Sequence, residues 1–245
     1  IIPKSLMKIS MQITLPIFSR WQDDPERIEK NYWRLIRLTS VVGLPICVLI
    51  AVLAEPLVLI LYGQKWHSST PLLRVFALYA ALQCFGGGLM AVIYASGNPH
   101  LAAVKNCFRF IFLPLAVLIG STGGIMGIVW GLVVFEFVAR LFNHGLITWS
   151  LKFSFFKFFK VLARPVIASA GMAFVGFGTM RVIYTPHSIL TMVLSAAAVG
   201  LISIVFYIAF AWRTMPEETS LIINEVRSKV FRPMLKNFKL NGNIT

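Results

Sequence analysis

The sequence has few charged residues, and very few of them are acidic. Only 13% of the 245 residues are charged, with 9 Asp and Glu against 23 Lys and Arg, so the formal net charge is +14. About a quarter of the residues of an ordinary soluble domain are charged, because they must coat its surface. The scarcity of charge therefore excludes a soluble fold for most of the chain.

Cysteine and catalytic motifs are also scarce. The three cysteines, Cys47, Cys84 and Cys107, lie in or at the edge of apolar stretches, without the spacing of metal ligands. This placement is typical of inert thiols in apolar surroundings. His67 stands alone in a polar loop, as solvated histidines do. The chain has no HExxH, GxSxG or Walker motif, so the sequence predicts no enzyme and no metal or cofactor site.

Long apolar runs take the place of these features. Hydrophobic residues make up 58% of the chain, and residues 40–62 form the clearest run, with Glu55 as its only charged residue. A helix over this run rises about 1.5 Å per residue and so covers roughly 30 Å, which is the thickness of a bilayer hydrocarbon core. Pro45 and Pro56 each remove a backbone hydrogen bond, so we expect kinks that neighbouring groups must repair.

These runs predict an all-α, polytopic membrane helix bundle. We expect about six complete spans and part of a seventh, near residues 1–18 (partial), 40–62, 72–96, 101–120, 124–149, 162–184 and 189–212. A short amphipathic helix is predicted just before the span at 40–62, and the glycines at 86–88 permit either close helix approach or a local break. Residues 213–245 form a basic tail, whose residues 217–231 fit either a surface helix or a frayed end.

Basic residues are concentrated on one side of these spans. Seventeen Lys and Arg fall in residues 20–38, 97–110, 150–164 and the tail from 213, whereas the opposite connections hold only Lys65, Arg74 and Arg181. Since short loops rich in Lys and Arg stay in the cytoplasm, residues 20–38 and the C-terminus are predicted to be cytoplasmic. Membrane topology thus accounts for the positive charge without a nucleic-acid partner.

Several short segments are similar to the second half of Wzx-type oligosaccharide flippases. They are LPIFSR at residues 15–20, the charged loop with Tyr32 and Arg34, LAEPL at 53–57, LYGQKW at 61–66 and ASGNP at 95–99. The resemblance covers most of residues 1–212 and rests on loosely patterned positions, not on an invariant catalytic box. These proteins belong to the multidrug/oligosaccharidyl-lipid/polysaccharide exporter superfamily, which is built from two pseudo-symmetric helix bundles.

The resemblance implies a function and a set of partners. The chain would be the C-terminal bundle of a transporter that carries an undecaprenyl-diphosphate-linked sugar repeat across the bacterial inner membrane by alternating access. The repeat would serve O-antigen, capsule or exopolysaccharide assembly. The partners would be the lipid-linked oligosaccharide, the bilayer, the N-terminal half of the same transporter, and the polysaccharide polymerase with its chain-length machinery.

Such a transporter needs cations at membrane depth, because its cargo carries a diphosphate. The candidate substrate-binding residues are Lys4 and Lys8, which share a helix face, together with Arg109 and Arg140. The alternative for each is an interfacial side chain that reaches toward the lipid headgroups and serves only topology.

Two other functions fit parts of the sequence. An ion-coupled small-molecule or multidrug antiporter of the same superfamily would need a carboxylate deep in the bundle, for which Glu136 and Glu55 are the candidates. Glu136 is also expected to pair with Arg140, four residues on, which would weaken that arginine as an anion site. A non-transporting membrane scaffold for glycosyltransferases is the other alternative, and the free-energy cost of charges at membrane depth counts against it.

Overall fold

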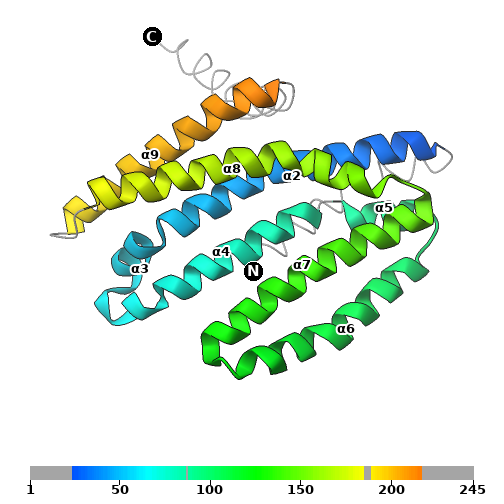
Figure 1. The fold of residues 1–245 in the computed structure, drawn as a ribbon, viewed down its shortest axis with the longest axis horizontal. Helices are drawn as coiled ribbons and strands as arrows, with labels where there is room; N and C mark the ends of the chain where they lie inside the picture. The colour runs from blue at the N-terminus through cyan, green and yellow to red at the C-terminus, as the bar shows by residue number, and fades with distance from the viewer. Residues whose placement is uncertain (1–23, 87, 185–188, 217–245) are drawn as a thin grey trace, which may run out of the picture.

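All regular secondary structure in the described part of the chain is helical. The computed structural model describes residues 24–86, 88–184 and 189–216 (Figure 1). The elements are α2 (Pro25–Val52), α3 (Ala54–Tyr62), the 3-10 helix η1 (Gln64–Ser69), α4 (Thr70–Gln83), the 3-10 turn η2 (Cys84–Gly86), α5 (Leu89–Ala95), α6 (His100–Ser121), α7 (Gly124–Leu151), α8 (Phe155–Ile183) and α9 (Ile189–Thr214). Within these ranges, six segments are long and apolar enough to cross a membrane. The predicted all-α membrane bundle is therefore confirmed.

Some predictions concern residues that the structure does not describe. The partial span near residues 1–18 lies outside the described ranges, together with Lys4 and Lys8. The same is true of the tail beyond residue 216. These assignments stay predictions, as does the assignment of the chain to one half of a two-bundle exporter.

The long helices lie side by side in one row. Each packs against the next in the order α9, α8, α2, α4, α7 and α6 (Figure 1). The row therefore has two edge pairs, α6 with α7 and α8 with α9. At one end of α4 lie α3 and η1, and at its other end η2 leads toward α5, which contacts α6.

Helix α2 joins two segments that the sequence predicted separately. The Asp24 side chain caps it by accepting a hydrogen bond from the backbone N–H of Arg27 at 3.0 Å. The helix then runs through the amphipathic segment and the apolar run without a break to Val52. It stops at Leu53 and does not continue to residue 62, because Pro56 has no N–H to offer the Val52 carbonyl and its ring crowds that oxygen.

The span predicted at 72–96 is broken at its glycines. Helix α4 ends at Gln83, η2 follows, and Gly88 has a φ of +74° immediately before α5. Glycine adopts this left-handed conformation without steric cost, and a Cβ at Gly88 would also overlap the Leu35 side chain. The glycines thus provide the local break and not a continuous helix.

The largest buried cluster lies where five helices meet near this break. It includes Tyr32 and Ile36 of α2, Val92 of α5, Leu101 of α6, Ile147 of α7 and Phe158 of α8. Beyond this cluster the side chains of α6 are exposed or only partly buried, since Leu101 and Ala102 are its only buried residues. The exposed remainder of α6 is largely apolar, as a surface in contact with lipid must be.

Candidate functional site

A cluster of charged side chains lies between α6 and α7. The Glu136 side chain is fully buried, and its Oε1 accepts a hydrogen bond from Arg140 Nε at 2.7 Å, with Arg140 Nη2 on the same oxygen. Arg109 of α6 approaches the other carboxylate oxygen, with Nη1 3.8 Å from Oε2. Lys105, one turn before Arg109, places Nζ 3.2 Å from Met90 Sδ and lies within electrostatic range of the other three charges. Two arginines therefore contact one carboxylate, and a third cation, Lys105, lies nearby.

Arg109 and Glu136 lie far from the ends of their helices, whereas Lys105 is five residues, or about 8 Å, from the start of α6. Arg109 follows the first residue of α6 by nine positions, or about 14 Å, and Glu136 follows the first residue of α7 by twelve, or about 18 Å. A hydrocarbon core is about 30 Å thick, so these side chains fall at membrane depth. Charge at this depth costs free energy unless it is paired, and here three positive charges share a single carboxylate, which both arginines contact.

The helix break lies directly beside this cluster. The Arg140 guanidinium packs against Gly86 so closely that a Cβ at that position would overlap it. The backbone carbonyls of the broken turn are bound by side chains of neighbouring helices. Thr39 Oγ1 donates to the Cys84 carbonyl at 3.0 Å, and His144 Nε2 lies 3.0 Å from the Phe85 carbonyl. Irregular backbone at membrane depth requires such partners, and it is where transporters place their binding sites.

His144 holds this arrangement together. It is buried, and its Nδ1 lies 2.7 Å from the hydroxyl oxygen of buried Tyr32. A carbonyl oxygen only accepts, so Nε2 carries the hydrogen bound to the Phe85 carbonyl, and Nδ1 accepts from the Tyr32 hydroxyl. The imidazole thus connects α2, α7 and η2 through two hydrogen bonds. These two hydrogen bonds hold in place the broken turn against which Arg140 packs.

The structure brings three of the predicted site residues together and leaves one elsewhere. Arg109, Arg140 and Glu136 share the cluster, and the expected pair of Glu136 with Arg140 is present. Glu55 lies on α3, near the other end of α4, where its carboxylate oxygens are 3.7 Å from His67 Nε2 and 3.7 Å from Arg74 Nη2. It is therefore not part of this site.

Sequence reasoning missed Lys105 and His144 as members of the site. Both carried a signal, because Lys105 precedes Arg109 by four residues and His144 follows Arg140 by four. Side chains at that spacing share a helix face. In the described ranges, no three His, Cys, Asp or Glu side chains gather as a metal site would require.

Comparison with known proteins points to polysaccharide biosynthesis. A family model described as "Polysaccharide biosynthesis protein" matches residues 2–71. The lipopolysaccharide biosynthesis protein WzxC of Escherichia coli K12 is 23% identical over 143 residues, which are 58% of this chain and 29% of that protein. The chain resembles the Wzx-type polysaccharide flippases. This resemblance, first seen in short sequence segments, is confirmed by independent matches.

Two further relatives match more of the chain. The teichuronic acid biosynthesis protein TuaB of Bacillus subtilis is 20% identical over 69% of this chain and 35% of its own length. An uncharacterized membrane protein in the cps region of Klebsiella pneumoniae is 21% identical over 84% of this chain and 40% of its own length. The chain thus spans about a third of the length of the relatives it matches. No solved structure matches it.

Proposed function

We propose that this chain is part of a transporter that moves a polyprenyl-diphosphate-linked oligosaccharide across the bacterial inner membrane for surface polysaccharide synthesis. The observation that carries the proposal is the cluster of Lys105, Arg109 and Arg140 around Glu136 at membrane depth. A diphosphate would supply the negative charge that this cluster lacks. The names of the matched relatives support polysaccharide biosynthesis as the context.

The three cations have different availability for an anionic headgroup. Arg140 is largely buried and already holds Glu136 with two nitrogens. The Arg109 side chain is 45% exposed and has a single, longer contact with the carboxylate. A guanidinium offers five N–H donors in a planar fork that suits phosphate oxygens. Arg109 is therefore the leading residue for headgroup binding, with Lys105 beside it.

Glu136 gives the site a means to release its cargo. The carboxylate and a bound diphosphate would compete for Arg109, so binding of one weakens binding of the other. Such competition suits alternating access, in which the site must bind on one side of the membrane and release on the other. Lys4 and Lys8 remain candidates for a second set of contacts from the span near residues 1–18.

The partners follow from the same proposal. They are the lipid-linked oligosaccharide, the polymerase and chain-length machinery that would receive it, and an N-terminal helix bundle that completes the path. The excess of basic residues in residues 20–38 and in the tail supports a cytoplasmic C-terminus. The structure lowers the number of basic residues that count toward this excess, because Lys105 and Arg109 lie inside α6 and not in a loop.

An antiporter with a carboxylate-coupled ion is the second candidate. The fully buried Glu136 favours it, because its Oε2 atom has no hydrogen-bond partner among the described residues. The surrounding positive charge disfavours organic cations as its cargo. Glu136 fits better as a coupling group inside the oligosaccharide transporter than as the centre of a drug-binding site.

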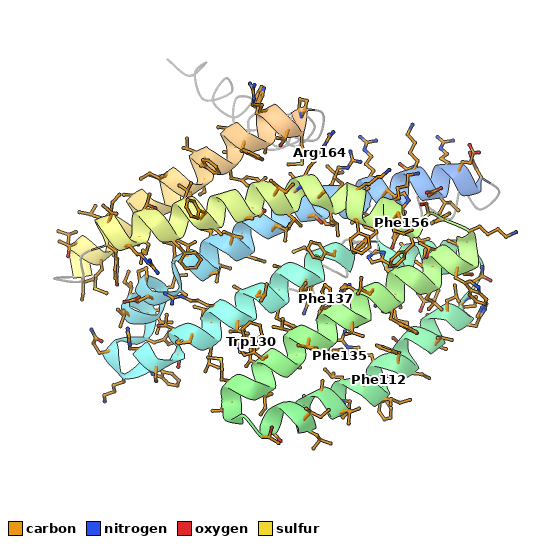
Figure 2. The ribbon with its side chains drawn as sticks, in the orientation of Figure 1. Phe112, Trp130, Phe135, Phe137, Phe156 and Arg164 are labelled. Carbon is orange, nitrogen blue, oxygen red and sulfur yellow. The ribbon has the colours of Figure 1, made fainter. Side chains whose placement is uncertain are left out.

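The test is export of surface polysaccharide in cells that carry edited copies of the gene encoding this chain. We expect the double variant Lys105→Gln, Arg109→Gln to lower export per unit of membrane-inserted protein by at least about tenfold, since charge-assisted hydrogen bonds to the headgroup are lost. Arg109→Lys should keep part of the activity, because the charge persists while the planar fork is lost. Arg164→Gln on α8, well away from α6 and α7 (Figure 2), is the matched control and should export normally. Normal export from the double variant would refute the proposal.

A further inference from the structure

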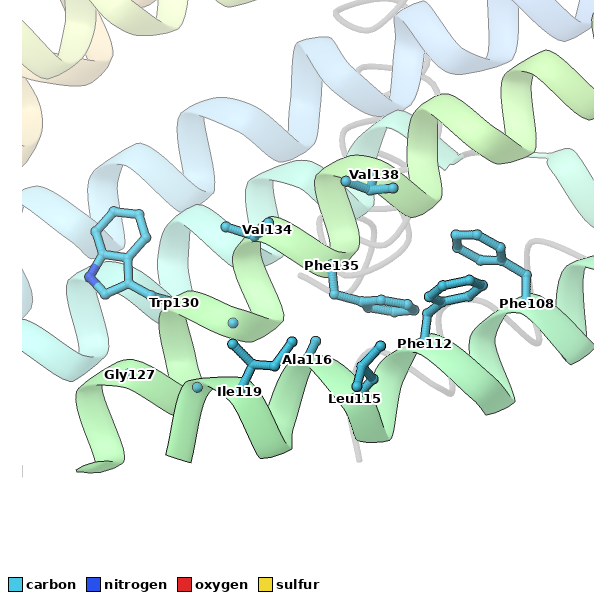
Figure 3. Close-up of a pocket in the computed structure, with 12 residues that line it drawn as sticks. Phe108, Phe112, Leu115, Ala116, Ile119, Gly127, Trp130, Val134, Phe135 and Val138 are labelled. Atoms are coloured by element: carbon cyan, nitrogen blue, oxygen red, sulfur yellow. The ribbon is translucent and has the colours of Figure 1, made fainter. Parts of the chain in front are cut away.

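An apolar groove of about 490 Å³ runs between α6 and α7 (Figure 3). Every residue that lines it is apolar, and it lies at the bare edge of the helix row (Figures 1 and 3). Trp130 and Val134 of α7 are 48% and 60% exposed along its mouth, so the groove opens toward lipid. Its volume falls within the range of about 300–1,000 Å³ that is usual for small-molecule sites.

The two ends of the groove have different walls. At the end nearest the α6–α7 turn the helix backbones almost touch, since a Cβ on Gly131 would lie 2.5 Å from the Ala116 carbonyl oxygen. At the other end the wall is aromatic. There the Phe108 ring lies 4.6 Å from that of Phe112 and 6.3 Å from that of Phe135, centre to centre (Figure 3). The groove is thus a slot that is closed at one end by glycine packing and bounded at the other by rings.

The aromatic end of the slot adjoins the charged cluster. Arg109 directly follows Phe108, and its guanidinium carbon lies 5.8 Å from the centre of the Phe135 ring. Since Glu136 is already held by Arg140, the half-exposed Arg109 presents positive charge where the apolar lining stops. A ligand with a long apolar chain and an anionic head would match the apolar groove and the positive charge at its aromatic end.

We propose that this groove holds the isoprenoid chain of the lipid-linked diphosphate, with its head at Arg109. The inference rests on the proposed function and adds to it a binding site for the lipid part of the cargo. Moving an apolar lipid chain from the bilayer into the groove releases little free energy, because both surroundings are equally apolar. Selectivity must therefore come from the diphosphate at Arg109 and from the fit of the chain between α6 and α7.

Lipid binding to the purified protein tests the proposal. The protein containing this chain, in detergent, is titrated with undecaprenyl diphosphate, undecaprenol and phosphatidylglycerol, and bound lipid is measured by native mass spectrometry. We expect undecaprenyl diphosphate to bind at least about tenfold more tightly than either of the other two, because only it has both the chain and the diphosphate.

Two variants with matched controls locate the site. Val134→Trp fills the groove, and Val205→Trp makes the same change at a residue of α9 that is 64% exposed. Arg109→Gln removes the head contact, and Arg164→Gln on α8 is its control. We expect Val134→Trp and Arg109→Gln each to weaken undecaprenyl diphosphate binding by about tenfold or more, and both controls to bind as the wild type does.

Each contrary result has a definite meaning. Equal binding of undecaprenol would show that the head makes no contact, and equal binding of phosphatidylglycerol would show a general site for anionic bilayer lipids. Either result, or normal binding by Val134→Trp, overturns the inference. Because the readout is binding, it is separate from export. Suppose that the wild-type protein binds undecaprenyl diphosphate as expected, but the double variant Lys105→Gln, Arg109→Gln exports normally. The proposed function would then be wrong, and the groove would remain a lipid-binding site.

Discussion

The two edge pairs of the helix row solve the problem of membrane burial in different ways. In the pair of α8 and α9, close contact depends on small residues, and a Cβ on Gly176 would lie 2.9 Å from Ser203 Oγ. The charged residues of this pair lie toward the helix ends, and there is none between Pro165 and Met180 or in α9 before Arg213. The pair of α6 and α7 instead gathers its four charged residues in one cluster beside an open groove.

Two hydroxyl groups of α9 bind backbone carbonyls inside the protein. Pro45 in α2 has no N–H, so the Val41 carbonyl, four residues earlier, loses its helical partner. The Tyr207 hydroxyl of α9 donates to that carbonyl at 2.7 Å. Ser203 Oγ likewise donates to the Val199 carbonyl at 2.8 Å. Both of these hydroxyls have partners, whereas the cations clustered between α6 and α7 outnumber their carboxylate. The pair of α6 and α7 is the one that we expect to act on a substrate.

Removing the single carboxylate of the cluster should have the largest effect on stability. In Glu136→Gln the buried Arg140 loses its counter-charge, and breaking a buried ion pair in this way costs about 3–5 kcal/mol. We expect much less protein in the membrane and a lower midpoint of thermal unfolding in detergent. The control is Glu55→Gln on α3, whose looser and partly exposed pairs contribute at most about 1 kcal/mol. Equal stability of the two variants would show that Glu136 is not the counter-charge that holds the cluster.

A methyl group at the helix break should have the next largest effect. In Gly86→Ala the new Cβ overlaps the Arg140 guanidinium and pushes it away from Glu136, a kind of overpacking that costs about 1–3 kcal/mol. Gly178→Ala on α8 meets no atom within 4 Å and should be neutral or slightly stabilising, since alanine favours helices. Thermal unfolding of both variants in detergent is the measurement. A neutral Gly86→Ala would mean that Arg140 has room to move without loss.

The sequence predicted the features that lipid enforces and missed those that depend on contacts between helices. Hydropathy identifies spans because every backbone group in a bilayer needs a helical partner. The pair of Glu136 with Arg140 was also predictable, since both lie on one helix. The contact of Arg109 with Glu136 was not, because it joins different helices, and nothing in the spacing of 109 and 136 specifies which faces meet.

The same limit explains the interrupted helices. Pro56 and the glycines at 86–88 were visible as sites of disturbance, yet the sequence did not decide between a kink, a close approach and a break. The outcome depends on neighbours such as Thr39 and His144, which bind the carbonyls freed at the break. The groove was also beyond sequence reasoning, because its lining residues are apolar like the rest of the lipid-facing surface.

The smallest predicted effect concerns the pair of α8 and α9. Tyr207→Phe removes the donor to the Val41 carbonyl and should lower stability by about 0.6–1.5 kcal/mol while export per inserted protein stays normal. The cause is testable by a double-mutant cycle with Pro45→Ala, which restores a backbone N–H for Val41. In that background the loss of the Tyr207 hydroxyl should cost nearly nothing, as measured by thermal unfolding in detergent. If Tyr207→Phe costs the same in both backgrounds, the hydroxyl does not replace the donor that Pro45 removes. If it abolishes export at normal abundance, the contrast between a structural edge and a functional edge fails.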